Sequence, residues 1–266
     1  MKRHGKFWKV LEMLFEDRQR KIIELLERQG SVKVSDLARD LGISKVTVRR
    51  HLDMLSKQIP IVRVRGGALS NKEGTSYEPD YDVKSGKYLE IKQRIGSLAA
   101  SLVSSGETLI IDAGSTTWHV AYSLIGKSNL TIVTNDLKIA LLLANTSDIN
   151  VYLIGGKIRP YIFSSFGHSA EEYLKSFNVN KLFLGADSVD IKKGITNANA
   201  EESHLKQEMI HSAKEVILVT DSSKFNKISF AKVSDFSVID CVISDKKVPK
   251  KYKNLFVEKG IELNLV

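Results

Sequence analysis

The sequence predicts an α/β protein of two domains, a small helical domain followed by a larger, mostly parallel α/β domain. Residues 31–68 carry two short amphipathic helical patterns joined by a glycine, and then an alternating apolar and basic run. From residue 108 onwards, short continuous apolar runs alternate with helical patterns, as in a parallel sheet that is covered on both faces. The net positive charge is confined to the N-terminal quarter: residues 1–72 hold 17 Lys and Arg against 8 Asp and Glu, whereas residues 73–266 hold 23 of each.

Composition and length restrict the class of protein. A chain of 266 residues with 42% hydrophobic content can bury a sizeable core. The single cysteine, Cys241, lies in an apolar run, so we expect a core residue and no disulfide within the chain. The sequence lacks an apolar run of about 18 residues and a signal-peptide pattern, and we therefore expect a cytoplasmic protein with no membrane partner.

The N-terminal domain is predicted at residues 14–70. Its first helix covers about residues 16–29, where Ile22, Ile23, Leu25 and Leu26 form the inner stripe and Gly30 ends the helix. Two further helices follow, each with a capping residue and an apolar stripe. Ser35 can cap the first and Gly42 can end it, while Ser44 can cap the second. The stripes are Leu37, Ala38 and Leu41 in the first of these helices, and Val48, Leu52 and Leu55 in the second.

The outward face of the second helix indicates DNA binding. At 100° per residue, Arg49 and Arg50 fall away from the apolar stripe and near the helix N-terminus, the part of a recognition helix that meets base edges. The alternating run at residues 61–68 predicts a β-wing with Ile61, Arg63 and Arg65 on one face, so that both arginines reach a phosphate backbone together. A generic helical hairpin with a basic face is the alternative, but the wing and the confined charge favour a winged helix-turn-helix. The candidate DNA-binding residues are Ser44, Lys45, Thr47, Arg49, Arg50, Arg63 and Arg65.

Residues 71–83 lose periodicity and collect Gly, Pro, Ser and Asp, which predicts a linker before a domain at residues 84–266. That domain opens with an amphipathic helix at about residues 91–102. The predicted strands are 108–112, 130–133, 151–154, 181–184, 216–220, 238–243 and 261–266.

Polar residues follow five of these strands, and ligands in open α/β sheets bind at the carboxyl ends of the strands. The five segments are 112–117, 134–136, 155–159, 185–187 and 221–224. Small and hydroxyl residues entering a helix after the first strand offer N–H and O–H groups to a phosphate, and Lys224 can add a charge. Any one segment is explained by turn or cap chemistry. Five segments at equivalent ends indicate a binding site.

These residues carry a resemblance to the DeoR family of transcriptional regulators over nearly the whole chain. The N-terminal motifs are ArgGlnArg at 18–20, AspLeuAla at 36–38, LeuGlyIleSer at 41–44, ThrValArgArg at 47–50 and GlyGlyAla at 66–68. The C-terminal motifs are AspAlaGlySerThrThr at 112–117, ThrAsn at 134–135, GlyGly at 155–156 with Arg159, GlyIleThr at 194–196 with Glu201, and AspSerSerLysPhe at 221–225. His51, Arg65 and Asp136 depart from the residues that the family usually has.

The resemblance implies a sensor domain similar to ribose-5-phosphate isomerase, which binds a phosphorylated sugar or a related metabolite and changes the affinity for DNA. It further implies a regulator of a sugar-metabolism operon, with repression as the expected mode. The candidate effector residues are Asp112, Gly114, Ser115, Thr116, Thr117, Asn135, Gly155, Gly156, Arg159, Asp187, Glu201 and Lys224. Within this set we assign residues 114–117 and Lys224 to the phosphate, and Asp112, Asn135, Asp187 and Glu201 to the sugar hydroxyls.

Two enzyme classes stand as alternatives. Asp112, Asp187 and Glu201 could include a carboxylate base, as in a sugar-phosphate isomerase with a DNA-binding appendage. A nucleotide-binding enzyme is not supported, because neither G-x-G-x-x-G nor G-x-x-x-x-G-K-[ST] occurs. The six histidines lack ligand spacing, so we expect no metal and no cofactor. We also expect a homo-oligomer, because one small winged module contacts few bases.

Overall fold

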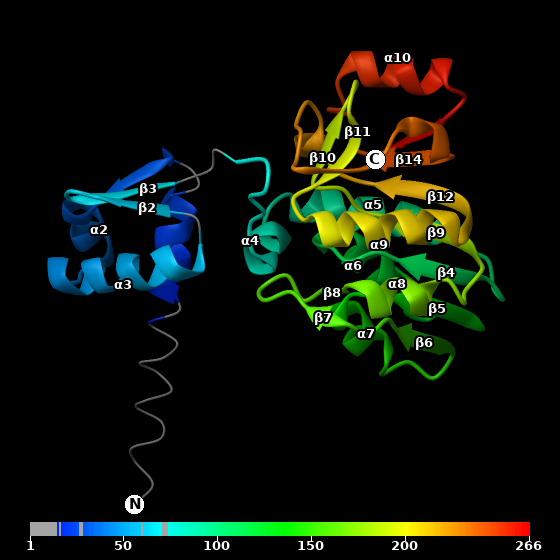
Figure 1. Ribbon diagram of the computed structural model, residues 1–266, viewed down its shortest axis with the longest axis horizontal. Coiled ribbons are helices and arrows are strands. Elements are labelled where there is room, and N and C mark those ends of the chain that lie inside the picture. Colours follow the sequence, from blue (N-terminus) through cyan, green and yellow to red (C-terminus); the bar gives the residue numbers. More distant parts are fainter. Residues whose placement is uncertain (1–14, 16, 27–28, 60, 71–73) are drawn as a thin grey trace, which may run out of the picture. The chain divides into compact units, whose positions relative to one another are not determined.

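The computed structural model describes residues 15, 17–26, 29–59, 61–70 and 74–266, which divide into two compact units, Met1–Tyr77 and Glu78–Val266 (Figure 1). The second unit starts before the position predicted from the sequence, residue 84. A helix, α4 (Tyr81–Gly86), follows almost at once, and the Tyr81 side chain is buried. Polar composition suggested a linker here, but one buried aromatic ring is enough to fix the segment.

The first unit confirms the predicted winged helix-turn-helix. Residues 17–26 are helical, and Ile22 and Leu26 are buried. The following elements are β1 (Ser31–Lys33), α2 (Val34–Leu41), α3 (Lys45–Gln58), β2 (Ile61–Val64) and β3 (Gly67–Ser70). The three strands form an antiparallel sheet in the order β1-β3-β2. The sheet and the helices share one core, made by Ile22, Leu26, Val32, Val34, Leu37, Val48, Leu52, Leu55, Ile61 and Ala68.

Of the three residues predicted at the ends of α2 and α3, two are confirmed. Ser44 caps α3 by accepting from the N–H of Thr47 at 3.1 Å, and Gly42 ends α2 with φ of 65°. Ser35 was predicted to cap α2, and this is wrong. The helix begins two residues earlier, with Lys33 at the cap position, because β1 leads directly into it and the N–H of Val34 donates to the Gly66 carbonyl at 2.8 Å.

The second unit is built on a seven-stranded parallel sheet that contains all seven predicted strands. Its order is β15-β14-β12-β9-β4-β5-β6. The strands are β4 (Thr108–Ile111), β5 (Leu130–Thr134), β6 (Ile149–Leu153), β9 (Val179–Leu184), β12 (Ala213–Val219), β14 (Cys241–Ser244) and β15 (Glu262–Leu265). The strand predicted from residue 238 starts only at Cys241, because Phe236–Val238 form a short 3-10 turn.

Helices cover both faces of this sheet, so consecutive strand residues pack into different cores (Figure 1). In β4, Leu109 and Ile111 join one core, whereas Ile110 joins the other. The first core includes residues of α5 (Leu89–Ser101), α6 (Ser115–Ser123) and α7 (Leu137–Leu143). The second includes residues of α8 (His168–Leu174), α9 (Ala200–His211) and α10 (Lys250–Glu258). Burial on both faces explains the unbroken apolar runs of the sequence.

Two small antiparallel sheets were not predicted. One pairs β7 (Lys157–Ile158) with β8 (Ser165–Phe166). The other joins β10 (Ser188–Asp190), β11 (Gly194–Asn197) and β13 (Ala231–Ser234). Strands of two to four residues are too short to show a clear alternation in the sequence.

The strand order reverses at β4, and this places the site. The chain proceeds from β4 to β5 and β6 on one side, whereas β9, β12, β14 and β15 lie on the other. The loops after β4 and β9 therefore diverge and leave a crevice between them, which is where open α/β sheets bind ligands. None of the helices in the described part of the chain combines the length and the apolar run needed to cross a membrane.

Candidate functional site

The exposed face of α3 presents cationic side chains. Lys45, Arg49 and Arg50 are all exposed. The hydroxyls of Ser44 and Thr47 lie 2.8 Å apart and bond each other at the start of the helix. Five of the predicted DNA-binding residues thus lie together on α3 and its cap.

The wing differs from its prediction, because its two arginines do not point out together. Arg63 lies on the same face as the buried Ile61, so its guanidinium turns back to the body of the unit. Its Nε donates to Asp53 of α3 at 2.8 Å, and another nitrogen donates to the Gly67 carbonyl. Arg65 is exposed in the turn between β2 and β3. Arg63 therefore ties the wing to α3, and only Arg65 is presented freely at the wing.

His51, one of the departures from the family pattern, is a core residue. Its side chain is buried and its ring centroid lies 4.6 Å from that of Phe15. Burial, together with Arg18 and Arg50, lowers the pKa of His51 below its ordinary value. The ring thus points from α3 into the core and is not part of the exposed cationic face of the helix.

The second unit encloses a cavity of about 40 Å³ at the carboxyl ends of β4 and β9, room for only a few water molecules. Its walls combine the loop after β4, the loop after β9 and side chains from α4 and α9. The lining residues are Glu78, Lys84, Asp112, Ala113, Gly114, Ser115, Thr116, Thr117, Asn135, Ile162, Gly185, Ala186, Asp187, Asn197, Glu202, Lys206, Val219 and Lys224.

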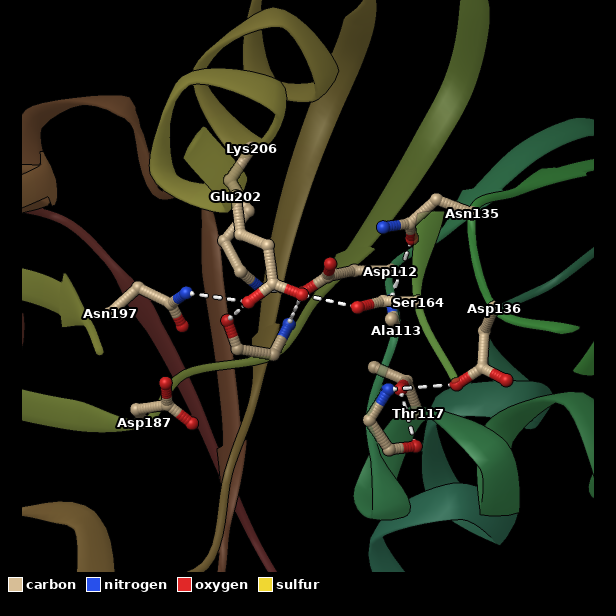
Figure 2. Close-up of polar contacts among 12 residues, drawn as sticks. Asp112, Ala113, Thr117, Asn135, Asp136, Ser164, Asp187, Asn197, Glu202 and Lys206 are labelled. Carbon is tan, nitrogen blue, oxygen red and sulfur yellow. Dashed lines mark hydrogen bonds and ion pairs between the residues drawn. The ribbon is translucent and has the colours of Figure 1, made fainter. Parts of the chain in front are cut away.

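Asp112, directly after β4, is the most deeply buried acid of this site. Its Oδ2 accepts from the Gly185 N–H at 2.8 Å and forms an ion pair with Lys206 of α9 (Figure 2). Burial raises the pKa of Asp112, and Lys206 opposes that rise. Its Oδ1 is buried without a hydrogen-bond partner among the described residues. A buried carboxylate oxygen of this kind needs a donor, which a ligand hydroxyl can supply.

The loop that leads from Asp112 into α6 is held by the next strand end. Asn135 Oδ1 accepts from the Ala113 N–H at 3.0 Å, and Asp136 Oδ2 accepts from the Gly114 N–H at 3.2 Å (Figure 2). The Gly114 N–H, which we assigned to the phosphate from the sequence, is therefore already used. The N–H groups of residues 115–117 have no acceptor in the part of the chain that the structure describes. These three remain for an anion at the N-terminus of α6.

Asp136, the departure from the family pattern in the C-terminal half, connects this loop to the start of α7. Its Oδ1 caps α7 by accepting from Lys138 and Ile139, while its Oδ2 holds Gly114. Burial raises the pKa of Asp136 to about 6, against the effect of these three donors. One carboxylate thus fixes both the start of α7 and the entry to α6.

Lys224 and Asp187 face the cavity from two other strand ends. The ammonium of Lys224 has no hydrogen bond or ion pair within the described residues. Burial and the neighbouring Lys84 lower the pKa of Lys224, although Asp187 opposes this. Burial disfavours the charge on Asp187, but Lys84, Lys224 and the Ala198 N–H outweigh it and keep the pKa of Asp187 below its ordinary value. Both groups are therefore available to a polar ligand.

The structure places Glu202 in the site, whereas Glu201, the residue taken from the sequence, lies outside it. Glu201 is exposed and its carboxylate is 4.0 Å from the ammonium of Lys157. Asn199 caps α9 by accepting from the Glu202 N–H at 2.9 Å, and this register turns Glu202 inward. Glu202 then accepts from Ser164 and Asn197 (Figure 2), and it also accepts from Arg159.

The loop after β6 contributes indirectly. Gly155 and Gly156, two predicted effector residues, do not line the cavity. A Cβ at Gly156 would lie 2.5 Å from the Phe166 carbonyl oxygen, so the glycine serves the close approach of β8. Arg159 reaches the site only through carboxylates that do line it, since its guanidinium is paired with Glu78 and Glu202.

Four important residues escaped the sequence analysis: Glu78, Lys84, Asn197 and Lys206. The first two stand in a stretch whose composition predicts a linker. Lys206, however, follows Glu202 by four residues and precedes the buried Met209 by three, a spacing that places all three on one helix face. That signal was present in the sequence. No group of three or more His, Cys, Asp or Glu in the described residues could hold a metal ion.

Comparisons with known proteins agree with this architecture. Residues 18–74 match the model of the DeoR-like helix-turn-helix domain, and residues 87–246 match that of the DeoR C-terminal sensor domain. The chain is 35% identical to a putative aga operon transcriptional repressor of Escherichia coli O157:H7, over 94% of this chain and 93% of that protein. It is 31% identical to the glycerol-3-phosphate regulon repressor of Escherichia coli K12, over 92% of this chain and 96% of that protein.

A solved structure of ribose 5-phosphate isomerase A from Methanocaldococcus jannaschii aligns with 52% of this chain and 54% of its own, at 16% identity and a TM-score of 0.39. So limited a likeness does not bear on function. The two matched domain models and the two relatives aligned over more than nine-tenths of the chain show its family. The chain belongs to the DeoR family of DNA-binding transcriptional regulators.

Proposed function

We infer that this regulator represses a sugar-metabolism operon, binds double-stranded operator DNA through α3 and its wing, and responds to a phosphorylated sugar in the cavity of the second unit. The names of its relatives support repression: one is named for the aga operon and the other for the glycerol-3-phosphate regulon. The exposed cations of α3 support the DNA contact, since Arg49 and Arg50 can pair with guanine edges or with phosphates.

The observation that carries the proposal is the anion site at the start of α6. Three N–H groups of residues 115–117 lack acceptors and lie at the positive end of the helix dipole. Lys224 lines the same cavity with an ammonium that has no partner in the described chain. A phosphate satisfies both requirements at once.

The same cavity also carries acceptors for a polyhydroxylated ligand. The unpartnered Oδ1 of Asp112 and the carboxylate of Asp187 are acceptors for ligand hydroxyls. The amide of Asn135 is less available, because it already bonds Ala113 and Ser165. Donors for a phosphate and acceptors for hydroxyl groups in one cavity together suit a sugar phosphate.

Homo-oligomer formation is part of the proposal. A single small winged module contacts few base pairs, so sequence-specific binding at physiological salt calls for two or more copies on repeated half-sites. Light scattering at working concentrations should give a mass at least twice the 29.7 kDa of one chain. A monomer that protects one half-site in footprinting would contradict this part.

A thermal-shift panel on the full chain tests the effector class. It should contain ribose-5-phosphate, fructose-6-phosphate, glucose-6-phosphate and glycerol-3-phosphate, each beside its unphosphorylated form. A ligand that binds only the folded state raises the apparent stability by mass action. We expect a rise in Tm with at least one phosphorylated compound and none with its neutral partner. Equal shifts for both forms would overturn the phosphate assignment.

The isomerase alternative has less support, because the relatives aligned over more than nine-tenths of the chain are named as regulators. It makes a different prediction for the same samples. An isomerase would convert a bound sugar phosphate during incubation, whereas we expect the recovered compound to be unchanged, as judged by NMR spectroscopy.

A further inference from the structure

Glu78 stands at the boundary between the two units in the sequence and also lines the candidate effector site. It is the first residue of the second unit, and Tyr77, its neighbour in the sequence, belongs to the first. Its side chain is nonetheless only 5% exposed and lines the cavity. A carboxylate that follows the boundary directly is therefore buried in the candidate effector site.

The Glu78 carboxylate forms ion pairs with two cations at that site. One oxygen pairs with Lys84 of α4, and the other pairs with Arg159. Both cations are largely buried, with side chains 12% and 19% exposed. Lys84 and Glu78 line the same cavity as the N-terminus of α6 and Lys224. The carboxylate thus holds a position that an anionic ligand group can take.

The segment that carries Glu78 has a separate anchor, which survives if the carboxylate leaves. The N–H of Tyr81 donates to the Tyr161 carbonyl at 2.9 Å, and its ring packs edge-on to Phe163. The ammonium of Lys138 lies 4.0 Å from the centre of the Tyr81 ring and 4.3 Å from that of the Phe163 ring. Residues from Tyr81 onwards are held by these contacts, so release of Glu78 frees the boundary without detaching α4.

Repulsion from neighbouring carboxylates disfavours the ionised Glu78 side chain in this position. Asp187 and Glu202 lie close enough that both, together with burial, raise the pKa of Glu78 above its ordinary value, while Lys84 and Arg159 oppose the rise. A phosphate that enters the cavity meets the Glu78 carboxylate as a further like charge. A ligand phosphate that reaches Lys84 must also displace this carboxylate from the ammonium, because Glu78 and Lys84 are paired in the wall of the same cavity.

We propose that Glu78 is a built-in competitor of the effector phosphate: the phosphate takes Lys84 from Glu78, and the released carboxylate carries the signal to the boundary between the units. The inference rests on the proposed function and adds Lys84 to the phosphate site. By linkage, an anion that binds only after the Glu78 carboxylate has left Lys84 shifts the population towards this displaced state. Any change that favours the displaced state therefore raises the affinity for the anion.

Calorimetry with inorganic phosphate tests the competition without knowledge of the sugar. We compare the full-length wild type with Glu78→Gln, which keeps the size of the side chain and removes its charge. Asp82→Asn is the matched control, because it removes an exposed carboxylate from the same segment. We expect Glu78→Gln to bind phosphate at least tenfold more tightly and Asp82→Asn to match the wild type. Equal or weaker binding by Glu78→Gln overturns the proposal.

A second variant separates the phosphate contact from general loosening of the segment. Lys84→Met should weaken phosphate at least tenfold, in the wild type and in Glu78→Gln alike. If Lys84 serves only to hold Glu78, then Lys84→Met instead tightens phosphate as Glu78→Gln does, and its role as a phosphate ligand is refuted. Thermal melts of each variant verify that the protein is folded before titration.

The signal is read from DNA affinity in the absence of any ligand. Glu78→Gln should shift operator affinity in the direction in which saturating effector shifts the wild type, and Asp82→Asn should not. If no sugar phosphate binds the wild type, the proposed function fails, while the phosphate titrations still decide the competition. If a sugar phosphate binds but Glu78→Gln leaves both affinities unchanged, only the competition fails.

Discussion

The two units place cationic side chains in opposite environments. On α3, Arg49 and Arg50 are exposed, and no ion pair engages either guanidinium within the described residues. In the second unit, Lys206 and Lys84 are buried and each is paired with a carboxylate. An exposed cation suits the phosphates of a long duplex, because these phosphates stay hydrated and exchange their counterions for the protein's cations. A buried cation suits a single small anion that leaves water entirely.

This contrast has an energetic consequence. Removing an exposed cation costs binding and leaves the fold intact. Removing a buried one leaves its carboxylate partner desolvated and unpaired, which costs stability before any ligand is considered. The four predictions below test this division, beginning with the largest effect.

Lys206→Met should be the most damaging of these substitutions to the fold. The side chain is 8% exposed and pairs with Asp112, which is 1% exposed. Breaking a buried pair from one side costs about 3–5 kcal/mol. Urea unfolding of the full chain at neutral pH should show a loss of this size in the second unit.

The control for Lys206→Met is the double variant Asp112→Asn with Lys206→Met, which removes both charges. It should recover much of the lost stability, because no uncompensated charge stays buried. A single variant as stable as the wild type would show that Asp112 is already neutral or hydrated in the site.

Arg49→Ala and Arg50→Ala should lower operator affinity by about 1–3 kcal/mol if either side chain reads a guanine. Stability should change by less than about 0.5 kcal/mol, because both side chains are exposed on α3. Arg39→Ala is a suitable control, since Arg39 is an exposed arginine of α2 that pairs with acids of its own helix. Unchanged affinity in both α3 variants, measured by fluorescence anisotropy, would refute the recognition face.

Lys224→Ala should weaken the phosphorylated sugar at least tenfold, about 1.4 kcal/mol, and leave DNA binding in the absence of ligand intact. The reason is the loss of one charge-assisted bond to the phosphate. Calorimetry with the best compound of the panel measures it. Lys227→Ala, an exposed lysine three residues further on, is the matched control and should bind like the wild type. An equal loss in both variants would mean that only overall charge matters.

The parts of the fold that were predictable are those where burial leaves a repeating pattern. The central strands of the parallel sheet appeared as apolar runs because they are covered on both faces, whereas the edge strands β6 and β15 are more exposed. The α3 helix was predictable from its cap and stripe, Ser44 with Val48, Leu52 and Leu55. The strand-end rule then located the loop at residues 112–117 without any knowledge of the structure.

The remaining features depend on single contacts between distant residues. Glu78 and Lys84 stand among Pro, Asp and Ser residues, and the burial of Tyr81 with its contacts to Tyr161 and Lys138 fixes this segment in the second unit. Arg63 was assigned to DNA because strand alternation pairs it with Arg65, but its place beside Ile61 directs it to Asp53. Glu201 and Glu202 are adjacent acids, and the cap at Asn199 decides which of them faces inward.

The smallest expected effect is a pH dependence of stability that belongs to Lys92 of α5. This lysine is 3% exposed, and its ammonium donates to the Lys84 carbonyl and, at 3.0 Å, to Ser115 Oγ. It forms no ion pair within the described part of the chain, unlike Lys206. Burial lowers the pKa of Lys92 to about 8, with Lys224 and Lys84 adding to the effect and Asp221 opposing it.

The sign of this dependence follows from proton uptake. Between pH 8 and the ordinary lysine pKa of about 10.4, the folded protein has lost the Lys92 proton while the unfolded chain keeps it. Unfolding then takes up a proton, so this group's contribution to the free energy of unfolding rises with pH. From pH 7 to pH 9 the rise is about 1 kcal/mol for a pKa displaced this far. Lys92→Met should lack it, whereas Lys193→Met, at an exposed lysine of the same unit, should keep it. Denaturation at both pH values gives the difference between variant and wild type, in which the other titrating groups cancel. If the two curves stay parallel from pH 7 to pH 9, Lys92 is not the desolvated cation that the contrast between the two units requires.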